Sequence, residues 1–139
     1  MSKQQQWAVI DELVDWLRHR PLAHYSEDLD TLLVHAGTHP TWSVNKTLRR
    51  AAEVEAVLQG PKFATLLSKM YGNRPSYWAG THKGYGRLRF IINCLTRMRM
   101  LTPDMHFNMR ATGAPWRGGK KRIAWFDFPE PAWGATRIV

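Results

Sequence analysis

The sequence predicts a fold that combines α-helices with β-strands. Apolar residues recur at helical spacing in two segments, 7–20 and 86–99, whereas residues 31–35 (TLLVH) form a short apolar run between turn-forming residues. The chain has 139 residues, of which 44% are hydrophobic. This length and composition suit one ordinary domain with a real core. We therefore expect an α/β chain of the mixed, α+β kind.

The N-terminal part begins with an expected amphipathic helix over residues 7–20, which Pro21 ends. Residues 22–30 are polar and are expected to be a connection. The run TLLVH over 31–35 is expected to be a buried strand, because it is short, apolar and bounded by turn formers. The apolar stripe of the helix has the i, i+3, i+4, i+7 spacing and consists of Ile10, Leu13, Val14 and Leu17.

Helices are also expected in the middle of the chain. Ser43 is a suitable N-cap for a helix over 44–58, and a proline at its first turn suits a helix over 61–71. A loop over 72–84 separates these from the helix over 86–99. The apolar stripe of this last helix consists of Leu88, Ile91, Ile92, Leu95 and Met98.

The C-terminal part predicts short strands joined by loops. A hairpin is expected around residues 102–104, where a Thr-Pro-Asp turn lies, and a Gly-rich basic loop over 111–122. A strand is predicted over 123–128, and the β-branched residues of 136–139 predict the start of another.

The composition indicates which classes of partner the protein binds and in which cellular compartment it lies. The net charge of +9 and the sequence pI of 10.2 favour anionic partners such as nucleotides, nucleic acid or acidic surfaces. Cys94 is the single cysteine, so no internal disulfide forms, and its place in an apolar helix favours a core residue over a reactive thiol. The sequence has neither an apolar run of about 20 residues, the length that spans a bilayer, nor the apolar core of a signal peptide. We therefore expect a cytoplasmic protein without a membrane partner.

His35 is the candidate metal ligand, because it stands at the end of the predicted strand and Gly37 follows closely. On spacing alone, a hydrogen-bonded core histidine is the favoured interpretation. One histidine does not make a metal site, and the sequence contains no HExxH, CxxC or GxSxG motif that would supply catalytic partners.

Basic and aromatic residues could bind a nucleotide. Arginines cluster at both ends of the expected 86–99 helix, where they could hold phosphates or simply form a solvated helix face. Four aromatic residues could stack on nucleobases, although core packing is the favoured interpretation for them. These two sets are Arg87, Arg89, Arg97 and Arg99, and Trp42, Tyr71, Tyr77 and Trp78.

Five blocks of the sequence carry a family resemblance, in the order and at about the spacing of that family. They are DELVDWLRHRPL (11–22), LLVHAGTHPTWSV (32–44), EVEAVL (53–58), MYGNRPSYW (70–78) and GYGRLRFIINCLTRMR (84–99). On these blocks the chain resembles the symmetrical bis(5'-nucleosyl)-tetraphosphatases, which are bacterial diadenosine tetraphosphate hydrolases of the calcineurin-like metallophosphoesterase superfamily. The resemblance is strong to about residue 101 and weaker beyond it.

The resemblance implies both a fold and a reaction. The fold is an α/β/β/α sandwich with helical insertions near the substrate. The reaction is cleavage of a dinucleoside polyphosphate, diadenosine tetraphosphate, into two ADP by two divalent metal ions, commonly manganese or cobalt. The resemblance also implies that His35 ligates one of the metals. Arg87, Arg89, Arg97 and Arg99 lie in the block specific to this subfamily, so we expect them to bind the substrate.

The chain also departs from the family. The Gly-Asp-x-His-Gly, Gly-Asp-x-x-x-Arg-Gly and Gly-Asn-His-Asp/Glu motifs, which supply most metal ligands and the general acid, have no counterpart here, nor does the final metal-ligand histidine. We therefore expect residues 1–139 to form a single partial metallophosphoesterase domain. By this reasoning the chain holds at most one of the metals and does not catalyse the reaction alone. The sequence identifies no catalytic residue and no oligomeric state.

Two other functions remain open. The chain could be a basic, aromatic-rich module that binds nucleotides, or less favourably nucleic acid, without chemistry. Such binding would depend on salt and would survive His35→Ala. The chain could also be the remnant of a disrupted gene that folds poorly.

Overall fold

The computed structural model describes residues 1–110 and 122–139. It confirms the expected mixture of helices and strands, which is consistent with part of a metallophosphoesterase fold. In this part of the chain the elements are α1 (Lys3–Arg18), β1 (Ala23–Ser26), β2 (Thr31–Val34), α2 (Val44–Gln59), α3 (Phe63–Lys69), α4 (Gly84–Thr96), β3 (Met100–Leu101), β4 (Ile123–Ala124), a 3-10 helix (Trp125–Asp127) and β5 (Arg137–Ile138).

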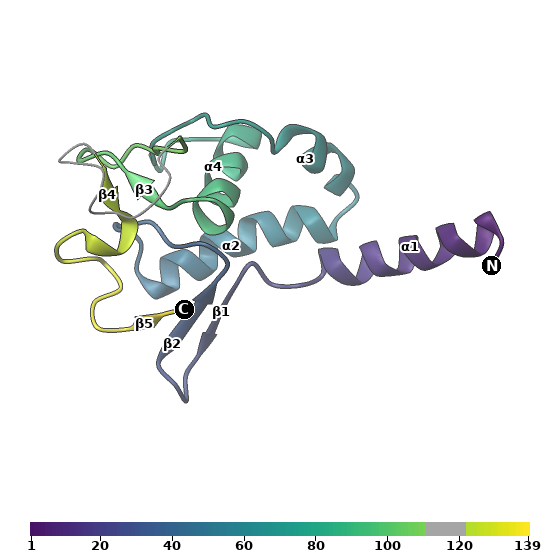
Figure 1. The fold of residues 1–139 in the computed structure, drawn as a ribbon, viewed down its shortest axis with the longest axis horizontal. Helices are drawn as coiled ribbons and strands as arrows, with labels where there is room; N and C mark the ends of the chain where they lie inside the picture. Colours follow the sequence, from purple (N-terminus) through teal and green to yellow (C-terminus); the bar gives the residue numbers. More distant parts are fainter. Residues whose placement is uncertain (111–121) are drawn as a thin grey trace.

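The main sheet has the strand order β1-β2-β5 (Figure 1). β1 and β2 form an antiparallel hairpin in which Ala23 faces Val34, and β5 runs parallel to β2 with Ile138 beside Leu32. The predicted strands over 31–35 and 136–139 are present as the shorter β2 and β5. The expectation that the first is buried holds for Thr31 and Leu32 only, because Leu33 is 41% exposed and His35 lies outside the strand. The prediction of a plain connection over 22–30 was wrong, because β1 lies there. This strand buries only Ala23 fully, so its sequence lacks a clear period-two pattern.

Helices α2 and α4 pack against each other and enclose the core (Figure 1). Ser43 caps α2 as predicted, since its Oγ accepts a hydrogen bond from the Lys46 amide at 3.2 Å. The buried face of α2 consists of Thr47, Ala51 and Val54. The buried face of α4 consists of Phe90, Ile91, Asn93, Cys94 and Leu95.

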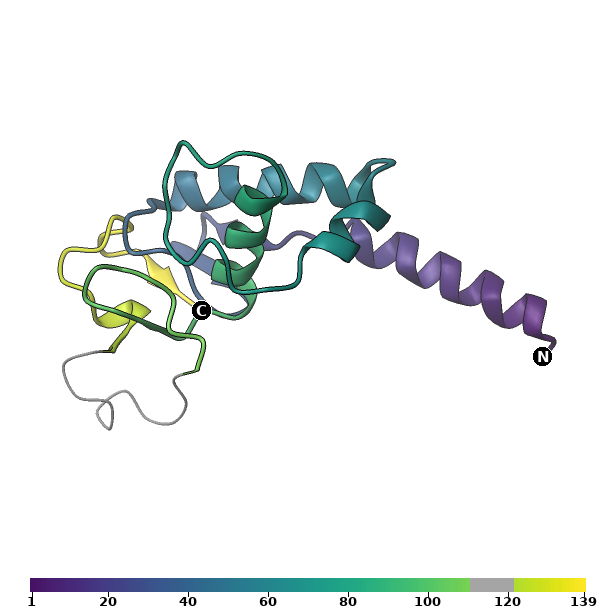
Figure 2. The same cartoon turned by 90° about the horizontal axis from the view of Figure 1, so that it is seen from above.

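Helix α1 is confirmed as a helix, but its apolar stripe does not pack into the core. Leu13 and Leu17 are 56% and 59% exposed, and the helix projects from the body of the molecule (Figures 1 and 2). Only its C-terminal end is tied down, where Arg18 donates hydrogen bonds to the carbonyls of Leu58 and Gly60. Periodicity predicts that one helix face is apolar, but it does not predict what covers that face. Among the described helices, none is long and apolar enough to cross a membrane.

Several predicted boundaries were wrong. α3 and α4 are shorter than the expected helices over 61–71 and 86–99, and α4 also begins earlier. The predicted strand over 123–128 is limited to β4, because the chain turns into a 3-10 helix at Trp125. The expected hairpin around residues 102–104 is present, with Leu101 bridged to Phe107. The expected loop over 111–122 lies outside the described residues except for its last position.

An ion pair holds the loop between α3 and α4 against the helices. Nε and Nη2 of Arg87 donate to the carboxylate of Glu53 at 2.6 and 3.0 Å. Nη1 of the same arginine donates to the backbone carbonyls of Gly80 and His82, which belong to the loop. The Arg87 guanidinium also lies over the ring of Trp78, 4.9 Å from its centroid. The pair therefore links α2, α4 and the loop.

Gly37 allows a close approach behind β2. A Cβ at this position would lie 2.7–2.9 Å from atoms of the Trp125 indole ring, so only glycine leaves room for the ring. This contact joins the segment after β2 to the 3-10 helix. The sequence analysis noted Gly37 as a sign of a nearby site, whereas the structure shows that it accommodates an aromatic side chain.

Replacing Gly37 should destabilise the protein. For Gly37→Ala we expect the free energy of unfolding to fall by about 1–3 kcal/mol, the usual cost of an extra methyl group in a packed site. Gly80→Ala is the matched control, because a Cβ there meets nothing within 4 Å. Urea unfolding of both variants gives the comparison, and equal stability of the two would refute the packing argument.

The ion pair of Glu53 should contribute to stability in a pH-dependent way. Hydrogen bonds from Arg87, and secondarily from Arg50, hold the pKa of Glu53 below its ordinary value. Because the folded-state pKa is depressed, the stabilisation is complete above the ordinary carboxyl pKa and is lost as the pH falls through the folded-state pKa. Glu53→Gln should therefore lower the free energy of unfolding near pH 7 by about 1.5–3 kcal/mol, as for hydrogen bonds to charged groups.

The same substitution should reduce the loss of stability on acidification. Urea unfolding near pH 7 and near pH 3 measures both effects. Glu12→Gln on the exposed surface of α1 is the control, and it should behave like the wild type. An unchanged acid dependence in Glu53→Gln would show that the pair does not couple folding to protonation.

Candidate functional site

His35 lies directly after β2 and its side chain is exposed. The backbone around it is fixed: the Val34 amide donates to the Val139 carbonyl at 2.8 Å, and the Ala36 amide donates to the Leu95 carbonyl at 2.8 Å. The end of β2 is therefore tied to both β5 and the last turn of α4. These bonds fix the backbone on both sides of His35, from which the imidazole reaches the surface.

A cavity of about 430 Å³ borders His35. Arg99, which follows α4, and Trp125 also line it. The structure therefore brings together two of the residues that the sequence analysis selected, although they lie far apart in the chain. An imidazole and a guanidinium on one cavity wall can bind an anion such as a phosphate group.

The cavity does not provide a complete metal site. Among the described residues, no group of three or more histidine, cysteine, aspartate or glutamate side chains lies close enough to hold a metal ion. His35 offers one nitrogen ligand, whereas protein metal sites use several. The residues described here thus do not fit two metal ions by themselves.

The other selected arginines bond within the fold. Arg87 is engaged by Glu53 and the loop carbonyls, as described above. Arg89 donates from Nε and Nη2 to the Lys69 carbonyl at the end of α3, at 2.8 and 2.6 Å, and from Nη1 to the Arg74 carbonyl at 3.0 Å. These guanidinium groups hold backbone carbonyls in place, which satisfies acceptors that the loop would otherwise leave open.

Arg97 and Arg99 differ from each other. Nη1 of Arg97 donates to the Asn93 side chain at 3.0 Å and to the Gly72 carbonyl at 3.5 Å. Arg99 is exposed, and its guanidinium forms no hydrogen bond or ion pair with the described residues. Of the four arginines, Arg99 is thus the one that lines the cavity of His35 and bonds to no other residue in the described part of the chain.

The aromatic residues divide into two pairs. Trp42 is 1% exposed and lies in the core, and Trp78 packs edge-on against it with ring centroids 5.0 Å apart. Core packing is therefore confirmed for these two residues. Tyr71 and Tyr77 are 75% and 46% exposed, so their rings are accessible to a ligand.

His39 is a buried titratable residue that sequence reasoning missed. It is 3% exposed and lies beside the rings of Trp42 and Phe90. Nδ1 bonds to the Thr41 hydroxyl at 2.7 Å, while Nε2 has no hydrogen-bond partner among the described residues. Burial lowers the pKa of His39 to about 4, so the ring is neutral at pH 7. It is a core group, as is Cys94, whose thiol pKa is raised by burial.

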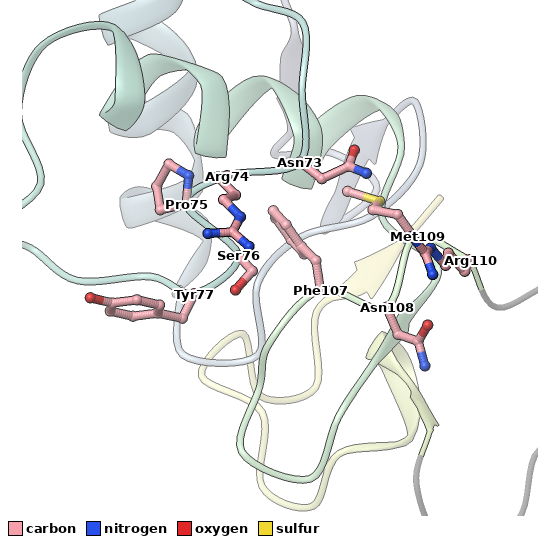
Figure 3. Close-up of a pocket in the computed structure, with 9 residues that line it drawn as sticks. All are labelled: Asn73, Arg74, Pro75, Ser76, Tyr77, Phe107, Asn108, Met109 and Arg110. Atoms are coloured by element: carbon pink, nitrogen blue, oxygen red, sulfur yellow. The ribbon is translucent and has the colours of Figure 1, made fainter.

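A second cavity, of about 520 Å³, lies between the 72–83 loop and the 100–110 hairpin (Figure 3). Arg74 and Arg110 line it, together with Tyr77. Sequence reasoning selected Tyr77 but missed both arginines, because they lie in loops where no periodic pattern predicts which segments meet. The only signal was the inclusion of Arg74 in the block MYGNRPSYW.

No family model matches the chain. Curated relatives do match it: proteins from Thioalkalivibrio sulfidiphilus and Bordetella pertussis are 44% and 47% identical over 128 residues, and one from Coxiella burnetii is 36% identical over 128 residues. Each carries the name symmetrical bis(5'-nucleosyl)-tetraphosphatase, and each alignment covers 92% of this chain. The aligned region is 47%, 46% and 44% of these relatives, so the chain spans about half of their length. Along almost all of its own length, the chain is therefore homologous to one portion of the symmetrical bis(5'-nucleosyl)-tetraphosphatases.

Proposed function

We propose that this chain forms part of a hydrolase that cleaves dinucleoside tetraphosphates symmetrically. The observation that carries the proposal is the 44–47% identity over 128 residues to proteins named for that activity. In the proposed reaction, water attacks one of the two central phosphorus atoms of diadenosine tetraphosphate, and the central phosphoanhydride bond breaks. The oxygen of the water stays on that phosphorus, the bridging oxygen leaves on the other one, and the protons of the water pass to the phosphates or the solvent, which gives two molecules of ADP.

His35 is proposed as a ligand of one metal ion. An imidazole that is exposed at a strand end and fixed by backbone hydrogen bonds is well placed to bind a metal. Two divalent ions, manganese or cobalt, are proposed for the complete enzyme. The described residues do not complete their sites, so we propose that the isolated chain is inactive.

Arg99 is the arginine best supported as a substrate contact. Its guanidinium has free donors in the cavity that His35 borders, and arginine binds phosphate through two parallel hydrogen bonds. A phosphate contact from Arg87 or Arg89 would have to replace bonds that hold the fold. We propose that Arg87 and Arg89 hold the loop between α3 and α4 in position. Arg97 contributes one further bond to this loop, at the Gly72 carbonyl.

A binding module without catalysis is the alternative. The net charge of +9 and the two exposed arginines that line the second cavity favour it. In that case the chain would bind nucleotides in a salt-dependent manner, and His35→Ala would not weaken the binding. For either function we propose a cytoplasmic protein.

Hydrolysis is tested with diadenosine tetraphosphate and either manganese or cobalt, by following ADP with chromatography. We expect the 139-residue chain alone to release no ADP above the blank. Co-expression with the portion of one of the homologous enzymes that this chain does not cover should restore activity. In the restored complex, His35→Ala should abolish turnover, and Arg99→Ala should lower it by about 100-fold, as when one donor to a developing charge is removed.

The matched control is His24→Ala, an exposed histidine on the neighbouring strand β1, which should retain activity. Steady ADP release by the chain alone, lost on His35→Ala, would mean that the chain completes its own site. Restored activity that does not depend on His35 would contradict its proposed role.

A further inference from the structure

We propose that the second cavity binds a nucleoside diphosphate. The cavity lies between the 72–83 loop and the 100–110 hairpin and shares no lining residue with the cavity of His35 (Figure 3). Its volume of about 520 Å³ falls in the range of small-molecule sites. The inference rests on the proposed function for its choice of ligand, since a nucleoside diphosphate is the product of that reaction.

The walls of the cavity are fixed by the core. The Phe107 amide donates to the Ser76 carbonyl at 2.7 Å, which joins the hairpin to the loop. The ring of Phe107 stacks on the buried Phe90 with centroids 4.4 Å apart. The Arg74 carbonyl accepts a hydrogen bond from Arg89 at 3.0 Å. The site therefore exists before a ligand binds, which lowers the entropy lost on binding.

The charge of the cavity is positive. Arg74 lies on one side of the Phe107 ring and Arg110 on the other (Figure 3). Both are exposed, and neither guanidinium bonds to another described residue. The described lining includes no aspartate or glutamate. Asp104, in the adjoining hairpin, is not part of the lining, and its carboxylate bonds to Thr102. Two guanidinium groups that have no acidic partner among the described residues favour a phosphorylated ligand.

The cavity also offers a flat aromatic surface and neutral polar groups. The ring of Tyr77 is 46% exposed and lies 5.1 Å from the ring of His106, which Ser76 holds by a hydrogen bond of 3.0 Å. An exposed, supported ring of this kind stacks on nucleobases. The side chains of Asn73 and Asn108 form no hydrogen bond with the described residues, so their amides can bond to a base edge or a ribose hydroxyl.

The size of the cavity favours one nucleotide over a nucleic-acid strand. Its lining comes from two short segments, 73–77 and 107–110. Single-stranded nucleic acid is usually bound along a groove that covers about 4–16 nucleotides per binding domain. A mononucleotide has a base that can stack on Tyr77 and phosphates that can bind Arg74 and Arg110. A single nucleotide therefore matches the binding groups of the cavity.

Calorimetric titration of the 139-residue chain with ADP, in the presence of EDTA, tests the inference. We expect saturable binding. The double substitution Arg74→Ala with Arg110→Ala should weaken it by at least tenfold, and Tyr77→Ala by about tenfold, as expected for the loss of one stacked base. The matched controls are Arg49→Ala and Trp7→Ala, which remove an exposed arginine and an exposed aromatic residue outside the cavity and should leave the affinity unchanged.

Two further probes separate a nucleotide site from simpler explanations. Inorganic pyrophosphate should bind at least tenfold more weakly than ADP, and a 12-residue oligothymidylate should not bind more tightly than ADP. Equal affinity for pyrophosphate would reduce the cavity to an anion site, and tighter binding of the oligonucleotide would indicate a nucleic-acid surface. Equal losses in the control variants would place the binding elsewhere. Each of these results would overturn the inference.

Further measurements distinguish a loss of ADP binding from the unfolding of a variant and from a failure of the proposed hydrolysis. Thermal unfolding identifies any variant that has lost its fold, and side-chain amide signals of Asn73 and Asn108 in the wild-type NMR spectrum should shift on addition of ADP. Absence of those shifts would refute the site without any variant.

The inference and the proposed function can fail separately. If ADP fails to bind while restored hydrolysis still depends on His35, only this inference is wrong. If ADP binds as expected but co-expression restores no hydrolysis, the proposed function is wrong.

Discussion

The packing around Phe90 is the constraint on which the rest of the structure depends. This side chain of α4 is completely buried and contacts rings from three other segments. His39 and Trp42 come from the turn after β2, Trp78 from the loop before α4, and Phe107 from the hairpin after it. These segments have little regular structure of their own, so burial of large aromatic surface supplies most of what holds them.

Phe107 of this aromatic core lines the second cavity, whereas the cavity of His35 is joined to α4 by the hydrogen bond from the Ala36 amide to the Leu95 carbonyl. The arginines at and near the two cavities divide into two kinds. Arg87 and Arg89 satisfy backbone carbonyls and a carboxylate, and so they fix the loop. Arg74 and Arg99 line the cavities, and their guanidinium groups bond to none of the residues that the structure describes. A clustered set of arginines in the sequence therefore contains both structural and ligand-binding candidates. Their hydrogen bonds distinguish the two kinds, because an arginine whose donors are all engaged must break those bonds to bind a phosphate.

Part of the fold could be predicted from the sequence, whereas the composition of the two cavities could not, and the reasons are physical. The strand of TLLVH and the cap of α2 by Ser43 follow from local patterns, and both are present. The stripe of α1 was recognised as apolar, but local patterns do not determine what lies against a helix face. His35 and Arg99 line one cavity, and Arg74 and the hairpin line the other, because of how loops pack. No periodicity in the sequence predicts such packing.

Phe90 and Leu95 both lie on the buried face of α4, so we expect the packing of Phe90 to stabilise the surroundings of both cavities. Native-state amide hydrogen exchange in a Phe90→Leu variant tests it most directly. The Ala36 amide, bonded to Leu95, reports on the first cavity, and the Phe107 amide, bonded to Ser76, reports on the second. We expect the protection of both amides from hydrogen exchange to fall by a similar amount in this variant. Loss of protection at one amide, with wild-type protection at the other, would show that the two cavities are held independently.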